Sequence, residues 1–158
     1  MNSTVTAIQC RPKGQFKFAS WAIRFFSKTN YSHYALQLNN NGIITYFDST
    51  MSGVRKHDEK AFEKYYEEVD RFHICQEDAF KFFTWFSEHD GKGYGVKQIG
   101  GLLLKIAGIV KNNPFGKGAK RIICNELVIL YLNHKGFTDI KDTDSLDLND
   151  TEEILRNL

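Results

Sequence analysis

A histidine and a cysteine that lie far apart in the chain each occur in a setting suited to thiol chemistry. His33 lies in the run NYSHYALQL, and Cys124 lies in the run RIICNELV. A thiol attacks a carbonyl carbon only as its thiolate, and a helix N-terminus or a nearby imidazolium lowers the pKa of the thiol. Catalytic groups meet through folding, so the order of these two residues along the chain is no obstacle.

Cys124 stands at the start of a predicted helix over 124–133, directly after the apolar pair Ile122 and Ile123. The positive end of that helix would favour the thiolate, and the free amide of the first helical residue could hold an oxyanion. The alternative is an inert cysteine buried at the beginning of a core helix. The sequence therefore marks Cys124 as a candidate nucleophile.

His33 falls on a predicted strand over 32–38, which the turn residues 39–42 connect to a second strand over 43–48. Asp48 ends the second strand, so the hairpin brings it close to the level of His33, where it could orient the imidazole. Ala35 and Leu36, the neighbours of His33, are expected to alternate between inward-facing and outward-facing positions. The alternatives are a solvent-facing or hydrogen-bonded strand histidine and a turn-forming aspartate.

Composition limits the other functions that the chain could have. A net charge of +2, without a basic-aromatic motif, argues against nucleic-acid binding. Three cysteines cannot all pair within one chain, which favours free thiols in a reducing compartment. Cys10 and Cys75 lie in strand patterns as small core residues. The other histidines (His57, His73, His89 and His134) have no metal-ligand spacing, so neither a metal nor a cofactor is expected.

The periodicity predicts one α+β domain over residues 1–158, a small antiparallel sheet with helices packed against it. The expected strands cover 4–9, 32–38, 43–48, a short extended piece at Val54, and 69–75. The expected helices cover 16–26, 59–68, 79–89, 124–133 and a short segment from 150, and a glycine-rich turn covers 90–95. Helix 16–26 should pack through its aromatic face, and helix 59–68 should be a charged surface helix.

Charge is distributed unevenly near the end of the chain. Residues 92–121 contain seven Lys and Arg and no Asp or Glu, whereas residues 137–158 contain seven acidic and two basic residues. Solvation of both segments is the simpler interpretation. The other is that the apolar and basic segment 97–121 forms a mobile wall of a substrate cleft, with Lys111, Lys117 and Lys120 contributing to substrate choice, or touches a membrane surface. Its glycines make a rigid helix along its whole length unlikely.

Five short motifs in order carry a resemblance to a known family. They are Thr29-Asn30-Tyr31-Ser32-His33, Asp48, Gly53-Val54, Gly91-Lys92-Gly93-Tyr94 and Cys124-Asn125-Glu126-Leu127-Val128. Together they resemble the circularly permuted NlpC/P60 proteins of the YiiX/YaeF type, which are papain-like thiol hydrolases, over about residues 13–155. The chain departs from the family pattern where Asp48 replaces the more frequent Glu and Asn125 replaces a usual Ser. The lysine-rich stretch between Tyr94 and Cys124 has no counterpart that we can name.

The resemblance implies a permuted papain-like topology and a catalytic triad. Cys124 would be the nucleophile, His33 the base and Asp48 the acid that orients the imidazole, with Tyr31, Tyr94 and Asn125 near the substrate. We therefore expect a cysteine hydrolase that cleaves an amide or peptide bond, with cell-wall peptides (peptidoglycan) as one candidate substrate. The alternatives are a lipid-directed thioesterase or acyltransferase with the same triad, its acyl pocket built from 99–110, and a non-catalytic binding or structural module.

Sequence patterns also bear on location. Residues 1–6 carry no positive segment followed by an apolar run, so no signal peptide is expected. The longest apolar stretch, 99–110, is twelve residues long and contains Lys105, whereas a membrane-spanning helix needs roughly 20 residues. The expectation is a cytoplasmic or phage-associated protein whose contact with a membrane, if any, is at the surface through 97–121.

Overall fold

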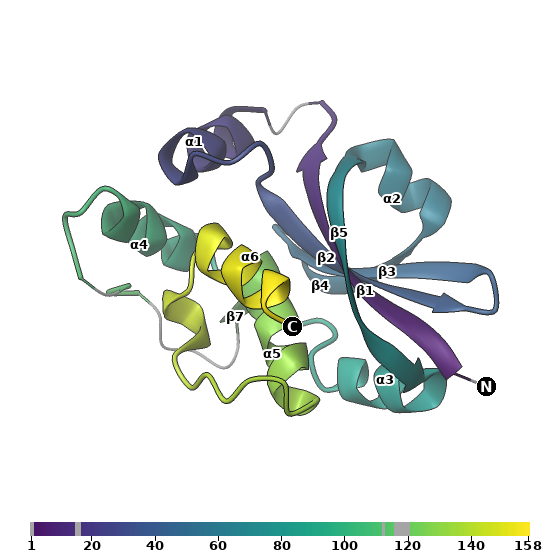
Figure 1. The fold of residues 1–158 in the computed structure, drawn as a ribbon. Coiled ribbons are helices and arrows are strands. Elements are labelled where there is room, and N and C mark those ends of the chain that lie inside the picture. Colours follow the sequence, from purple (N-terminus) through teal and green to yellow (C-terminus); the bar gives the residue numbers. More distant parts are fainter. Residues whose placement is uncertain (1, 15–16, 112, 116–120) are drawn as a thin grey trace.

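The computed structural model describes residues 2–14, 17–111, 113–115 and 121–158. In these ranges the chain forms a five-stranded antiparallel sheet and six α-helices, so the fold is mixed α+β, as the sequence predicts (Figure 1). The sheet has the order β4-β3-β2-β1-β5. Its strands are β1 (Asn2–Pro12), β2 (His33–Asn40), β3 (Ile43–Thr50), β4 (Gly53–Asp58) and β5 (Tyr66–Asp78).

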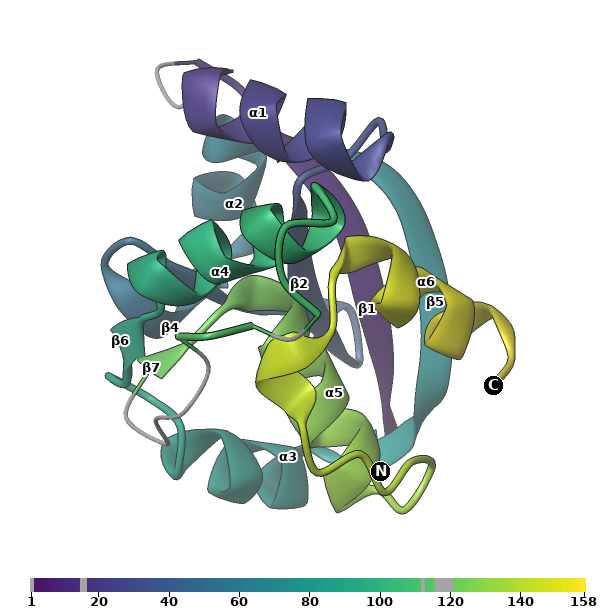
Figure 2. The same ribbon diagram turned by 90° about the vertical axis from the view of Figure 1, so that its left-hand side faces the viewer.

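The helices gather mainly on one side of the sheet, and two short elements complete the fold (Figures 1 and 2). The helices are α1 (Lys17–Ser27), α2 (Glu59–Tyr65), α3 (Ala79–Ser87), α4 (Val96–Ile106), α5 (Cys124–His134) and α6 (Leu148–Arg156). Strands β6 (Gly93–Tyr94) and β7 (Arg121–Ile122) pair in parallel, and a 3₁₀ turn, η1, covers Thr143–Ser145.

The hairpin of β2 and β3 forms as predicted because its turn residues tolerate left-handed backbone. Asn41 and Gly42 have φ of 53° and 88°, values that a two-residue hairpin turn of this hand requires. The side chain of Asn39 accepts a hydrogen bond from the Gly42 amide at 2.8 Å. The turn fixes the register in which Ala35 pairs with Asp48.

The core lies between the sheet and helices α3, α5 and α6, and a smaller cluster lies on the other side of the sheet. Leu36, Phe47, Phe82 and Leu127 are fully buried in the main core. The smaller cluster contains Ile8, Cys10, Ala35, Tyr46 and Phe62, the last from α2. Helix α2 therefore covers the second face of the sheet. Ala35 and Leu36 do lie on opposite faces of the sheet, but for this reason both are buried, and the expectation that one of them faces outward is wrong.

Helix α1 forms where the sequence predicts it but packs in the opposite way. Its inner face carries Ser20, Ile23 and Ser27, while Trp21 and Phe25 remain 51% and 63% exposed. The small inner side chains permit a close approach of the helix to the cavity described below. The prediction that this helix packs through its aromatic face is wrong.

Other boundaries differ from the predictions for local reasons. Helix α2 ends at Tyr65, because the chain from Tyr66 already belongs to the long strand β5. Helix α6 begins earlier than predicted, where the side chain of Asp147 accepts hydrogen bonds from the amides of Asn149 and Asp150. Helix α4 is regular over eleven residues although it contains two glycines.

Candidate active site

His33 and Asp48 lie together at one end of the sheet. Asp48 pairs with Ala35, two residues beyond His33 on the same face of β2, so the two side chains are diagonal neighbours. His33 Nε2 lies 2.9 Å from Asp48 Oδ2. A carboxylate can only accept a hydrogen bond, so this contact assigns the proton to Nε2 and directs Nδ1 to the opposite side of the ring.

The sulfur of Cys124 occupies that opposite side. The thiol and the His33 imidazole lie close enough for each to shift the pKa of the other, and because Nε2 faces Asp48, Nδ1 is the ring nitrogen left to face the sulfur. The backbone amides of Tyr34 and Asn125 also help to lower the pKa of the thiol. The thiol, imidazole and carboxylate thus lie next to one another, with a hydrogen bond between the imidazole and the carboxylate.

Electrostatics in this series favour the charged forms. Burial alone raises the pKa of the Cys124 thiol, but the charge of His33 and the hydrogen bonds to the sulfur lower it below its ordinary value. Burial opposes the imidazolium too, yet Cys124 and Asp48 raise the pKa of His33 to about 10. Both shifts therefore favour the thiolate and imidazolium form of the pair over the neutral form.

Asp48 has a second histidine partner that sequence reasoning missed. His57 Nε2 lies 2.9 Å from Asp48 Oδ1, so each carboxylate oxygen faces one imidazole. Asp48 is fully buried, which by itself raises its pKa, but hydrogen bonds from His33 and His57 lower that pKa to about 2. This contact could have been predicted from the strand register. The tight turn at 51–52 pairs Asp48 with Arg55, so residues 55 and 57 of β4 lie on the same side of the sheet as Asp48.

Aromatic rings hold the imidazole in its orientation. Tyr66 stacks on His33, with ring centroids 4.7 Å apart and an interplanar angle of 8°. Phe62 stacks in turn on Tyr66 and on Tyr46. Because Tyr66 comes from β5, this contact could not be found from the β2–β3 hairpin alone.

Buried polar contacts fix the start of α5 and therefore the thiol. The amide of Ile123 donates to Glu126 Oε2 at 3.3 Å, and Thr143 donates to Glu126 Oε1 at 3.1 Å. Ser49, next to Asp48 on β3, donates to the Ile122 carbonyl at 2.5 Å. These bonds explain why a Glu follows the cysteine by two residues, since it satisfies an amide at the helix N-terminus.

A cavity of about 40 Å³ lies beside Cys124. Its wall is mostly aliphatic: Ile23 from α1, Ile99, Leu102, Leu103 and Ile106 from α4, with Ile123 and Leu148. The polar atoms at its edge come from Ser27, Ser32, Tyr94, Asn125 and Asp147. Of the segment 97–121, which we predicted to form a wall of the site, the α4 part lines this cavity. Of the lysines to which we assigned substrate choice, Lys111 is exposed outside the cavity, and Lys117 and Lys120 lie outside the described residues.

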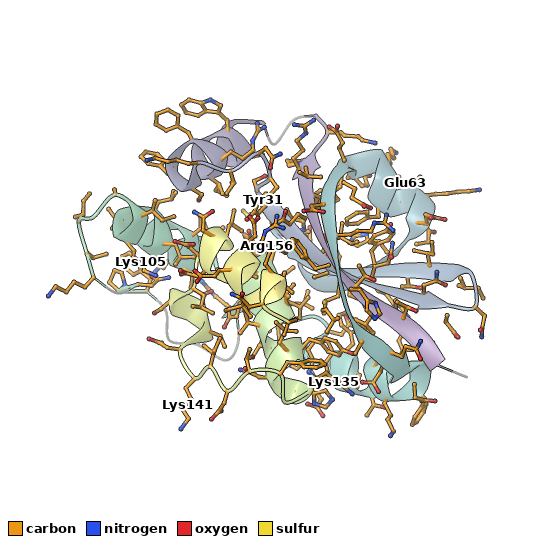
Figure 3. All side chains as sticks on the ribbon, viewed as in Figure 1. Tyr31, Glu63, Lys105, Lys135, Lys141 and Arg156 are labelled. Carbon is orange, nitrogen blue, oxygen red and sulfur yellow. The ribbon has the colours of Figure 1, made fainter. Side chains whose placement is uncertain are left out.

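The three residues predicted to contact the substrate differ in their position relative to the cavity. Tyr94 lines the cavity, and burial together with the charge of Cys124 raises its pKa. Asn125 borders the cavity, but its amide group donates to the Leu146 carbonyl at 2.8 Å and so ties the C-terminal segment to α5. Tyr31 does not line the cavity. Tyr31, labelled in Figure 3, is buried, and its hydroxyl donates to Glu152 of α6 at 2.6 Å, so its contact with a substrate stays a prediction.

Comparisons with known proteins add no assignment. No protein-family model matches this sequence, and the search of curated proteins gives no match. Among the described residues, no group of three or more His, Cys, Asp or Glu side chains could hold a metal ion. None of the helices in the described ranges is long and apolar enough to cross a membrane.

Proposed function

We propose that this chain is a cysteine hydrolase of the permuted NlpC/P60 type that cleaves an amide or peptide bond. The observation that carries the proposal is the buried Cys124 thiol beside His33, whose imidazole is hydrogen-bonded to Asp48 and lowers the pKa of the thiol. A buried thiol whose pKa is lowered by an oriented imidazole is the arrangement that thiol catalysis needs. A cysteine that served only as core would gain nothing from these partners.

The reaction follows from the charges of the pair. The Cys124 thiolate attacks the carbonyl carbon, and the His33 imidazolium transfers its Nδ1 proton to the departing amine, which leaves a thioester on the sulfur. Neutral His33 then takes a proton from water, and the resulting hydroxide attacks the thioester. The acid product leaves, and the thiolate and imidazolium are restored. Asp48 keeps Nε2 protonated throughout and stabilises the imidazolium.

The N-terminus of α5 supplies a donor for the tetrahedral intermediate. Cys124 is the first residue of the helix, so its amide has no partner within the helix and is free to donate to an oxyanion. Tyr94, at the edge of the cavity, would contact the substrate. Peptides, including peptidoglycan peptides, are the proposed substrate class.

Detection of the covalent intermediate tests the proposal. The protein would be mixed with p-nitrophenyl acetate, and intact-mass spectrometry with peptide mapping would follow an acetyl adduct on Cys124. We expect a burst of nitrophenol and an adduct that the Cys124→Ser variant lacks and the His33→Ala variant forms far more slowly. An adduct of equal size and rate in the His33→Ala variant would contradict the proposed roles.

The aliphatic wall of the cavity favours a second candidate, in which the same triad acts on an acyl ester or thioester. Seven Ile and Leu side chains line the space next to the sulfur. Each buried methylene contributes about 0.8 kcal/mol, so such a wall would favour longer acyl chains. Hydrolysis of p-nitrophenyl butyrate and octanoate, compared with a peptide p-nitroanilide, separates the candidates. Preference for the longer ester supports the acyl substrate, and preference for the anilide supports the peptide.

A further inference from the structure

The end of the molecule that carries α1 and α4 has exposed rings where a protein surface normally has polar side chains. On α1, Trp21, Phe25 and Phe26 are 51%, 63% and 43% exposed. Val96 at the start of α4 and Ile109 after its end are also exposed. Helices α1 and α4 contact each other and lie side by side in both views (Figures 1 and 2). We call this surface the α1–α4 face.

The α1 side chains that form this face are held on the outside by the packing of their own helix. Ser20, Ile23 and Ser27 follow the inner side of α1, and Ser20 shares a 2.6 Å hydrogen bond with Ser32. Trp21 and Phe25 are one helical turn apart on another side and stack on each other, with centroids 5.4 Å apart. Rotation of α1 to bury these rings would therefore break its inner contacts.

The charges within the α1 and α4 segments have one sign. Residues 17–28 contain three Lys and Arg, and residues 96–111 contain three Lys. Neither segment contains any of the 19 acidic residues. Lys28, Lys97 and Lys111 are exposed in the α1 and α4 segments.

The nearest carboxylates on α6 are already paired within the molecule. Asp150 lies 3.3 Å from Lys105 Nζ, and Glu152 accepts hydrogen bonds from Tyr31 and Arg156 (Figure 3). Asp147, which borders the cavity, accepts hydrogen bonds from the amides of Asn149 and Asp150, so among the described side chains Lys28, Lys97 and Lys111 are the exposed charges of the α1 and α4 segments. A surface with exposed rings, lysines and no acidic residues of its own complements an anionic bilayer, in which rings enter the interface and lysines contact headgroups.

We propose that the α1–α4 face docks on the surface of an anionic lipid bilayer. The cavity beside Cys124 lies between the same two helices, because Ile23 and Ser27 of α1 and Leu102 of α4 line it. Docking would thus hold the candidate active site close to the lipid. The inference goes beyond the proposed hydrolase function and does not rest on it, since the Cys124→Ala variant should bind lipid like the parent protein.

Co-sedimentation with vesicles tests the docking. The parent chain would be mixed with phosphatidylcholine vesicles prepared with and without phosphatidylglycerol. We expect binding to the anionic vesicles that weakens with added salt. The variant Trp21→Ser, Phe25→Ser, Phe26→Ser should lose most of this binding, and Lys28→Ser with Lys111→Ser should weaken it about fivefold for each lysine.

Matched controls come from the opposite end of the molecule. Phe80 on α3 is 79% exposed, and Lys141 is exposed and far from α1 (Figure 3). Phe80→Ser and Lys141→Ser should leave vesicle binding unchanged, and circular dichroism should show that every variant is folded. Equal loss in these controls, or no binding by the parent protein, overturns the proposal. So does a dimer in size-exclusion chromatography that the triple variant abolishes, because a second copy would then cover the face.

Discussion

The buried carboxylate between two imidazoles makes Asp48→Asn the most informative single change for stability. The pKa of Asp48 falls from an ordinary 3.8 to about 2, because the hydrogen bonds from His33 and His57 outweigh burial. At about 1.4 kcal/mol for each pH unit, this difference corresponds to about 2 kcal/mol of stabilisation by the ionised side chain. The asparagine amide would also direct an N–H group toward one of two N–H donors, which adds to the cost.

The sign of the pH dependence follows from the lowered pKa. A carboxylate with a lower pKa in the folded state stabilises the fold fully above its unfolded pKa of about 4, and this stabilisation is lost as the pH falls toward about 2. The free energy of unfolding of the parent protein should therefore exceed that of Asp48→Asn by at least about 2 kcal/mol at pH 6. This difference should shrink toward pH 2.

Urea unfolding at pH 6 and at acid pH measures this gap. Asp90→Asn is the matched control, because Asp90 is exposed in the turn after α3 and should unfold like the parent at every pH. If the free energies of unfolding of Asp48→Asn and the parent differ by only a few tenths of a kcal/mol at pH 6, Asp48 is not ionised between the two histidines. The account of the site's electrostatics would then be wrong.

Three further predictions concern the surroundings of this site. His57→Ala leaves Asp48 Oδ1 without its histidine partner and should lower the free energy of unfolding by about 1–3 kcal/mol. His57→Gln keeps a donor and should lower the free energy of unfolding less, so equal losses for the two variants would contradict the role of the hydrogen bond. Gly53→Ala should destabilise the fold by more than about 1 kcal/mol in thermal unfolding, because Gly53 has φ of +95° and a Cβ would lie 2.7 Å from the Lys92 carbonyl. Leu103→Trp should fill the cavity and slow hydrolysis of p-nitrophenyl octanoate more than that of p-nitrophenyl acetate. Leu104 does not line the cavity, so Leu104→Trp should leave the ratio of the two rates unchanged.

The parts of the fold that sequence patterns predicted are those set by short-range chemistry. The β2–β3 hairpin follows from its Asn-Gly turn, and the helix that begins at Cys124 follows from its apolar period and the following Gly136. The hairpin alone brings Asp48 to the side of His33. The meeting of Cys124 with His33 depends on contacts across more than seventy residues, such as Ser49 with the Ile122 carbonyl, which no local pattern encodes.

The errors arise where tertiary packing overrides local preference. The rings of α1 have the spacing of a buried face, but small serines on the other side let the helix approach the cavity and leave the rings exposed. The contact of Tyr31 with Glu152 of α6 could not be predicted from the motif next to His33, because it joins residues 121 positions apart. His57 escaped notice because a metal-ligand spacing was sought, whereas its role depends on strand register with Asp48.

The rate of Cys124 alkylation as a function of pH tests the central claim most directly. The native chain and the His33→Ala variant would react with iodoacetamide, and peptide mapping would follow Cys10, Cys75 and Cys124 separately. The account predicts that Cys124 stays reactive below pH 7, where a thiol with an ordinary pKa of about 8.5 is mostly protonated. Fully buried Cys10, whose pKa burial raises, should remain slow. The His33→Ala profile should move to that of an ordinary thiol, and identical profiles for the two proteins would contradict activation of Cys124 by His33.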